Sequence, residues 1–110
     1  MKKIVVYKTV NGKEPFNEWL FSLKDKTSRL RIHTRIRRIE DGNYGDYKKF
    51  LGLIEIRFDF GKGYRIYCVE DRQILVILLI GGDKDSQAKD INKALLYAED
   101  YYEQKKTKNI

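Results

Sequence analysis

The chain of 110 residues contains one cysteine and one histidine, and both scarcities limit its chemistry. Cys68 cannot form an internal disulfide and has no second thiol with which to build a metal site. It lies at the centre of a predicted strand, so we expect a buried core residue. His33 has no second histidine or carboxylate at the spacing of metal ligands, and we expect it on a helix surface. We therefore expect no metal site and no small-molecule cofactor.

Apolar residues form no long run in the chain. The longest run, residues 74–80, is far shorter than the ~20 residues that a membrane-spanning helix needs. Near the start, three apolar residues precede Tyr7 and Lys8, too few for the apolar region of a secretory signal. With 42% apolar and 35% charged residues, the chain is nevertheless too apolar to stay disordered. We expect one soluble domain, residues 1–110, in the cytoplasm.

Positive charge dominates the composition. Lysine and arginine number 23 against 16 aspartates and glutamates, which gives a net charge of +7. Such a charge favours association with a polyanion, either a nucleic acid or an acidic protein. Charge alone leaves both partners open, together with a simple role in solubility.

The first part of the chain has the pattern of a strand followed by a helix. Residues 4–7 form a short apolar strand, and Pro15 suits the first turn of a helix because its missing N–H has no partner there. Apolar residues follow at helical spacing up to Leu23. Trp19 belongs to that apolar face, so we expect it in the core rather than as a platform for base stacking.

A second helix follows after a short link. Asp25 or Thr27 can cap it, and it runs to about Asp41, with Gly42 as a stop signal. So short a link predicts an antiparallel helical hairpin. Opposite its apolar side the helix carries three arginines at helical spacing: Arg31, Arg35 and Arg38. Such a row can follow a phosphate backbone or lie in an acidic groove, and the alternative is a solvated helix face.

Residues 53–60 alternate between apolar and polar, which is typical of a strand with one face on the core. Glycines at 61 and 63 turn the chain, and a three-residue loop places Phe58 opposite Ile66 and Ile56 opposite Cys68. One face of this predicted hairpin then carries all the polar side chains: Glu55, Arg57, Asp59, Arg65 and Tyr67.

Residues 73–80 are apolar at nearly every position, as in a central strand covered on both sides. The strand ends at Gly81-Gly82, and Asp85 or Ser86 caps a last helix. The core stripe of that helix is predicted to contain Ile91, Ala94, Leu95, Ala98 and Tyr102. We expect the chain to fray over residues 101–110. The order of elements indicates an α+β domain.

The polar face of the hairpin offers a carboxylate, two arginines and a phenol, and the following glycine-rich turn adds Lys84. RNA cleavage needs a base that takes the proton of the 2′-hydroxyl and cations that stabilise charge on the phosphate oxygens. Arginine suits the second role because its planar fork binds phosphate oxygens in pairs. The alternative is a surface ladder of salt bridges among Glu55, Arg57, Asp59 and Arg65.

Three ordered motifs decide between these interpretations. They are Leu-x-Glu-Ile-Arg at 53–57, Gly-x-Gly-Tyr-Arg-Ile-Tyr at 61–67 and Gly-Gly-Asp-Lys-x-Ser-Gln-x-Lys-Asp-Ile at 81–91. Together with Gly-Asn-Tyr-Gly-Asp at 42–46, they resemble the RelE/ParE superfamily of bacterial toxins, in particular its HigB-like addiction module killer branch. The resemblance implies a RelE-like fold, in which a helical hairpin packs on a curved, mostly antiparallel sheet.

The same resemblance implies a function and site residues. Members of this branch are toxins of type II toxin-antitoxin systems that cleave messenger RNA in the ribosomal A site, and a small helix-turn-helix protein is the cognate antitoxin. Arg65 matches the arginine that such nucleases place on the scissile phosphate. Arg57 and Lys84 fall where they carry further basic residues. Glu55 departs from the lysine of the RelE proteins, and we take it as the candidate general base. The alternatives are Tyr67 or a site that works through its cationic groups.

The sequence thus predicts an endoribonuclease, an mRNA interferase, whose partners are the ribosome, messenger RNA and an antitoxin. Catalytic residues are expected to be Glu55, Arg57, Arg65 and Lys84. RNA contacts are expected from Tyr67, Arg31, Arg35 and Arg38. Two alternatives remain: a ParE-like inhibitor of DNA gyrase without catalytic activity, or a degenerate module that only binds its antitoxin.

Overall fold

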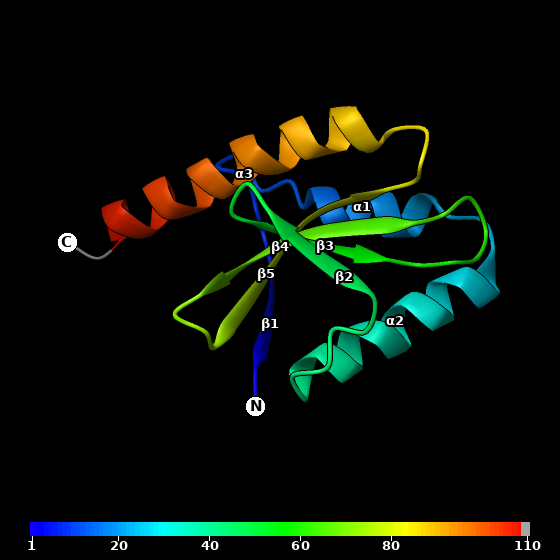
Figure 1. The fold of residues 1–110 in the computed structure, drawn as a ribbon. Helices are drawn as coiled ribbons and strands as arrows, with labels where there is room; N and C mark the ends of the chain where they lie inside the picture. The colour runs from blue at the N-terminus through cyan, green and yellow to red at the C-terminus, as the bar shows by residue number, and fades with distance from the viewer. Residues whose placement is uncertain (109–110) are drawn as a thin grey trace.

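The computed structural model describes residues 1–108 as a mixed sheet with helices on both faces (Figure 1). Its strands are β1 (Lys3–Val6), β2 (Tyr47–Phe50), β3 (Leu53–Arg57), β4 (Arg65–Asp71) and β5 (Leu75–Gly82). Its helices are α1 (Pro15–Ser22), α2 (Lys26–Glu40) and α3 (Gln87–Lys108). The predicted α+β class is confirmed: an N-terminal strand, two helices, a mostly antiparallel sheet and a C-terminal helix.

The strand order across the sheet is β1-β5-β4-β3-β2. β1 is parallel to β5, and the other neighbouring pairs are antiparallel. Residues 76–82 of β5 are all buried between the two faces. Such burial explains why this segment is apolar throughout, and the predicted central strand is confirmed.

Two hydrophobic clusters form the core, one on each face of the sheet. Phe16 of α1 and Ile32 of α2 pack with Ile56 on one face. Ala94 of α3 packs with Tyr67 on the other. Figure 1 shows α2 and α3 on opposite sides of the sheet. Cys68 belongs to the first cluster, as predicted, and burial raises the pKa of its thiol.

Local sequence explains where α2 begins and ends. The carboxylate of Asp25 accepts the backbone N–H of Thr27 at 3.0 Å and the hydroxyl of Ser28 at 2.8 Å. These bonds replace the partners that the first turn of a helix lacks. Gly42 has a φ of 87°, and its N–H donates to the carbonyl of Ile39 at 2.8 Å. Both boundaries agree with the prediction.

The register of the β3–β4 hairpin differs from the predicted one. Ile56 lies opposite Ile66, and Arg57 lies opposite Arg65, because residues 59–63 form a longer loop than expected. The pairing is shifted by two residues, which keeps each side chain on its predicted face. Asp59 is the exception, since β3 ends at Arg57 and Asp59 leaves the sheet with the loop.

Aromatic packing accounts for the longer loop. The ring of Phe60 packs edge-on against Tyr64, with centroids 5.8 Å apart, and against Phe58 at 5.5 Å. Both neighbours are buried. Pairing Phe58 with Ile66 would draw these rings out of that cluster.

Strand β2, which forms the edge of the sheet beside β3, was not predicted. Three of its four residues are exposed, so its pattern lacks the alternation of a half-buried strand. Leu51 and Gly52, with φ values of 52° and 78°, form the tight turn that joins it to β3. Lys48 and Lys49 place charge on this edge, which discourages pairing with other chains.

A bulge near the end of β5 sets the direction of its last residues. Tyr67 lies opposite Ile80 and Cys68 opposite Leu78, so Leu79 is the extra residue. Beyond the bulge, a Cβ on Gly81 would lie 2.2 Å from the ring of Trp19, and one on Gly82 would lie 1.7 Å from the carboxylate of Asp90. These close approaches explain both glycines. They hold α1 and α3 against the two faces of β5.

Helix α3 departs from the prediction at its two ends. Ser86, one of the two predicted caps, directly precedes α3, but its hydroxyl donates to Asp90 at 2.5 Å instead of accepting a backbone N–H of the helix. Asp83 accepts the backbone N–H groups of Asp85 and Ser86 at 2.9 and 3.2 Å and orders the preceding turn. Tyr101 packs on the sheet, and Tyr102, predicted for the core stripe, is 39% exposed.

The C-terminal part of α3 is ordered as helix up to Lys108, where fraying from residue 101 was expected. Lys105 pairs with Asp71 at 2.5 Å and the hydroxyl of Tyr101 donates to the same carboxylate at 2.8 Å, which attaches this end to β4. The rest of the expected fraying segment, residues 109–110, lies outside the described residues. No helix within residues 1–108 is long and apolar enough to cross a membrane.

The β4–β5 turn carries backbone strain. Arg72 and Gln73 have φ values of 55° and 62°, the left-handed region that glycine and asparagine adopt most readily. A tight hairpin turn of this kind favours Asn-Gly at these two positions.

We predict that Arg72→Asn combined with Gln73→Gly raises the free energy of unfolding by about 0.5–1 kcal/mol, because the new residues fit the turn without strain. Urea unfolding followed by circular dichroism measures the change. Gly52→Ala, at the turn before β3, is the control, and it should lower the free energy of unfolding because a side chain there is strained. A lower midpoint for the Asn-Gly variant would contradict the prediction.

Candidate functional site

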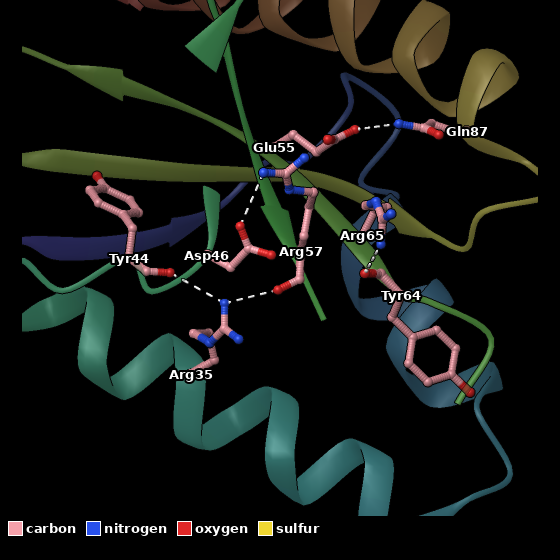
Figure 2. A network of polar contacts seen from close by, with 8 residues as sticks. All are labelled: Arg35, Tyr44, Asp46, Glu55, Arg57, Tyr64, Arg65 and Gln87. Atoms are coloured by element: carbon pink, nitrogen blue, oxygen red, sulfur yellow. Dashed lines mark hydrogen bonds and ion pairs between the residues drawn. The ribbon is translucent and has the colours of Figure 1, made fainter. Parts of the chain in front are cut away.

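A buried carboxylate lies beneath the start of α3. Glu55 of β3 is opposite Tyr67 of β4, and the two side chains are 2% and 0% exposed. The hydroxyl of Tyr67 donates to Oε2 of Glu55 at 2.9 Å, and Nε2 of Gln87 donates to the same oxygen at 2.8 Å. Figure 2 shows Gln87 reaching from α3 to this carboxylate. Hydrogen bonds of this kind are what make a buried polar group tolerable.

These contacts correct two expectations from the sequence. The predicted polar face is not a solvent-exposed ladder, since Glu55 forms no ion pair with an arginine among the described residues. Tyr67 has no exposed surface, so the predicted contact between its phenol and RNA is wrong for this conformation. Burial and the hydrogen bond to Glu55 raise the pKa of Tyr67 far above its usual range, so it stays protonated at neutral pH.

Two arginines lie side by side at the end of the β3–β4 ladder, next to the hairpin loop. Arg57 and Arg65 are direct partners on neighbouring antiparallel strands. Nη2 of Arg57 is 3.1 Å from Oδ1 of Asp46. Nη1 of Arg65 donates to the carbonyls of Gly63 and Tyr64 at 3.0 and 3.2 Å. Within residues 1–108, Arg65 has no carboxylate partner, and the Nε–H groups of both arginines are buried without an acceptor.

This arrangement favours an anion. Like charges directly opposite each other on neighbouring strands destabilise a sheet. Two unsatisfied N–H donors add a further cost. An oxyanion bound to the accessible part of the Arg57 and Arg65 guanidinium groups would offset the repulsion between them, because guanidinium groups bind phosphate and carboxylate oxygens strongly.

Lys84 approaches the arginine pair from the β5–α3 turn. Its side chain is exposed and lies over Gly63, where an added Cβ would be 3.0 Å from its Cγ. Its backbone N–H contacts the carbonyl of Lys62 at 3.4 Å. Since Arg65 also bonds to the Gly63 carbonyl, the structure brings together Lys84 and Arg65 at the tip of the hairpin. The predicted cationic residues Arg57, Arg65 and Lys84 thus share one region of the surface.

The arginine row of α2 is partly structural. The guanidinium of Arg31 lies 3.9 Å from the centre of the Phe60 ring, and that of Arg35 lies 4.6 Å from the ring of Phe58. Arg35 also donates to the carbonyls of Tyr44 and Arg57 at 3.3 and 3.1 Å (Figure 2). Arg35 therefore ties α2 to the strand that carries Arg57.

The outer members of the row remain accessible. Arg31 and Arg38 are exposed, as is His33, which agrees with the surface position expected for that histidine. Together with Asp59 and the Phe58–Phe60 segment, the row borders a hollow of about 230 Å³. An anion bound there would meet one carboxylate as well as the arginines.

Two residues of the site had no predicted role. Asp46 holds Arg57, and Gln87 holds Glu55. Both stand within the sequence motifs, Asp46 at the end of Gly-Asn-Tyr-Gly-Asp and Gln87 after Ser86. Their spacing along the chain gave no reason to bring either to β3. No group of three or more histidine, cysteine, aspartate or glutamate side chains in residues 1–108 is placed to hold a metal ion.

Comparisons with known proteins give one close relative without a stated activity. No protein-family model matches the chain, and no solved structure matches it. A protein of Haemophilus influenzae is 45% identical over 86 residues, which covers 77% of this chain and 87% of the relative. The chain belongs to the same family as that protein. The relative is described only as an uncharacterized protein, so it brings no function to this site.

We predict that Tyr67→Phe lowers the free energy of unfolding by about 1–2 kcal/mol, because Oε2 of buried Glu55 loses one of its two donors. Urea unfolding of the two proteins at neutral pH measures the difference. Tyr102→Phe is the matched control: its hydroxyl is on the surface, 3.4 Å from a backbone carbonyl, and we expect a change below about 0.5 kcal/mol. Equal losses for the two variants would show that the buried bond contributes nothing.

Proposed function

We propose that this chain is the toxin of a type II toxin-antitoxin system, a HigB-like member of the RelE/ParE superfamily that cleaves messenger RNA on the ribosome. The observation that carries the proposal is the cross-strand pair of Arg57 and Arg65, whose Nε–H groups are buried without an acceptor among residues 1–108. The ordered motifs at 53–57, 61–67 and 81–91 support it from the sequence.

In the proposed reaction, the scissile phosphate lies over Arg57 and Arg65. The 2′-hydroxyl loses its proton to water, and its oxygen attacks the neighbouring phosphorus. The bond from phosphorus to the 5′-oxygen breaks, which leaves a 2′,3′-cyclic phosphate and a 5′-hydroxyl that takes its proton from water. The two guanidinium groups stabilise the charge that develops on the phosphate oxygens. Lys84 adds a third cation from the β5–α3 turn. Strand pairing fixes the backbone positions of Arg57 and Arg65 before RNA binds, so the two arginines need no movement of the sheet to act on the transition state.

Glu55 has a supporting role in this proposal. Its carboxylate is 2% exposed and engaged by Tyr67 and Gln87, so a 2′-hydroxyl has no access to it in this conformation. Burial therefore argues against the general-base role suggested by the sequence. The site is proposed to work mainly by orienting the RNA and stabilising charge, with Glu55 fixing α3 and the adjacent turn.

The partners follow from this activity. The ribosome is proposed to present messenger RNA in its A site, and the exposed arginines Arg31 and Arg38 of α2 are proposed to contact the RNA backbone or the ribosome, with Arg35 held against β3. A helix-turn-helix antitoxin is proposed to neutralise the protein. The proposed activity requires no cofactor. Because ribosomes translate in the cytoplasm, the protein is proposed to act there.

We predict that expression of the protein without an antitoxin stops translation before DNA replication. Incorporation of labelled methionine should fall first, and incorporation of labelled thymidine should fall later, because cleavage of messenger RNA acts directly on protein synthesis. An earlier fall in thymidine incorporation would support inhibition of DNA gyrase instead. Unchanged growth would support a module that only binds its antitoxin.

We predict that Arg65→Ala lowers the rate of RNA cleavage by about 10²–10³-fold, the loss expected when one donor to a developing oxyanion is removed. A single-turnover assay on programmed ribosomes measures the rate. The fold should persist because the Arg65 side chain bonds only to carbonyls of its own loop. Arg37→Ala, which removes an exposed arginine of α2, should retain the wild-type rate within a few-fold. If Arg65→Ala cleaves RNA at a rate within tenfold of the wild-type rate, the proposed contact between Arg65 and the scissile phosphate would be wrong.

A further inference from the structure

A second cavity lies next to the β3–β4 loop, between α1 and the start of α3. It has a volume of about 700 Å³, within the range of small-ligand sites. Its walls come from α1, the β3–β4 loop, the end of β5 and the start of α3. We call it the Trp19 cleft, after the residue that lines it from α1. Its other principal lining side chains are Tyr64, Lys24, Lys62 and Lys93.

One wall of the Trp19 cleft is aromatic. Trp19 and Tyr64 form an edge-to-face pair with centroids 5.9 Å apart and an angle of 74°. Trp19 contacts the core, as predicted, but it is only partly buried and also borders the cleft. Its ring is fixed by close approach to Gly81, where a Cβ would lie 2.2 Å away. A fixed aromatic surface in a cavity suits the stacking of a nucleic-acid base.

The rest of the lining carries three lysines and three carboxylates. Lys24, Lys62 and Lys93 line the cleft, and within residues 1–108 none of them has an ion pair or a side-chain hydrogen bond. The carboxylates in the lining are engaged by local donors. They are Asp25, which caps α2; Asp83, which receives two backbone N–H groups; and Asp90, which accepts the hydroxyl of Ser86 at 2.5 Å. These neutral donors leave the three carboxylates charged, so the charges in the lining balance, and within residues 1–108 the three lysines are the charged side chains of the lining that have no ion pair or side-chain hydrogen bond.

The Trp19 cleft and the arginine pair meet at the hairpin tip. Arg65 donates to the carbonyl of Tyr64 at 3.2 Å and lies opposite Gly82, while Tyr64 and Gly82 both line the cleft. Figure 2 shows the Tyr64 ring directed away from Arg57 and Glu55, as expected for neighbouring residues at a strand end. A single strand of RNA can therefore pass from one site to the other across residues 62–64.

We propose that the Trp19 cleft binds one nucleotide of single-stranded RNA next to the nucleotide held by Arg57 and Arg65. Its base lies against Trp19, which Tyr64 supports from behind, and its phosphate pairs with Lys62 and Lys93. The inference rests on the proposed ribonuclease function and adds a second subsite to it. An RNA ligand is favoured over an acidic peptide because the cleft combines an aromatic surface with cations and continues into the arginine pair.

Trp19 is the single tryptophan of the chain, so its fluorescence reports on the cleft. The probe is a hexameric oligoribonucleotide with 2′-O-methyl groups, which lacks the attacking hydroxyl and stays intact. Wild-type protein should show quenching of Trp19 on binding. Lys62→Ala combined with Lys93→Ala should weaken binding by roughly tenfold, and the slope of log K against log salt should fall by roughly 1.4, about 0.7 for each lost phosphate contact.

The matched control is Lys3→Ala combined with Lys13→Ala, which removes the same charge from exposed positions outside the cleft. This control should retain the salt slope and bind within about twofold of wild type, with circular dichroism verifying the fold of both double variants. Equal weakening in the two double variants, or no quenching at all, would overturn the proposal. Equal quenching by an acidic peptide of the same length, with the same loss in Lys62→Ala/Lys93→Ala, would overturn it in favour of a protein-binding surface.

Cleavage on programmed ribosomes separates this inference from the proposed function. Lysine-dependent quenching without any cleavage would support the RNA subsite and overturn the ribonuclease. Cleavage without quenching would support the ribonuclease and overturn the subsite. Arg65→Ala should lose cleavage yet keep the quenching of Trp19, since it lies outside the cleft.

Discussion

The bond network of Glu55 is the interaction on which the rest of the site depends. One carboxylate oxygen joins β3, β4 and α3 through Tyr67 and Gln87. Gln87 is the first residue of α3, so this bond also fixes where the preceding turn lies. Lys84 belongs to that turn and approaches the hairpin tip. A polar group in the core thereby sets the relative positions of three structural elements, a task that apolar packing alone specifies less sharply.

The arginine pair is held in place against electrostatic repulsion. Strand pairing puts Arg57 opposite Arg65, while Asp46 compensates the charge of Arg57 alone. Arg35 of α2 then binds the backbone carbonyl of Arg57 and anchors the end of β3 from the other face. Repulsion of this kind is expected at a site for an anion, because functional residues often stand where folding alone would not place them. The Trp19 cleft, by contrast, uses residues that stabilise the core as well.

Much of the fold follows from periodicity and from local signals. Asp25 and Gly42 marked the ends of α2, and the apolar run before Gly81 marked the central strand. β2 was not predicted because an exposed edge strand has little hydrophobic pattern. The hairpin register was wrong because the packing of the Phe60 ring against Phe58 and Tyr64 is not visible in the alternation of apolar and polar residues. The faces of the hairpin were right, but the burial of Glu55 was not, since Glu55 is engaged by Tyr67 of β4 and by Gln87, which α3 brings to it.

The parallel pairing of β1 with β5 has a consequence for how the chain folds. Lys3 lies beside Leu75, a separation of 75 − 3 = 72 residues, and closing so long a loop is slow. During synthesis, the ribosome makes β1, α1, α2 and the β3–β4 hairpin before it makes β5, the strand that pairs with β1 and β4. Arg65 pairs with Gly82, and Glu55 is covered only after Gln87 has been added. A nascent chain therefore holds the two arginines without a fixed geometry until its last third has emerged.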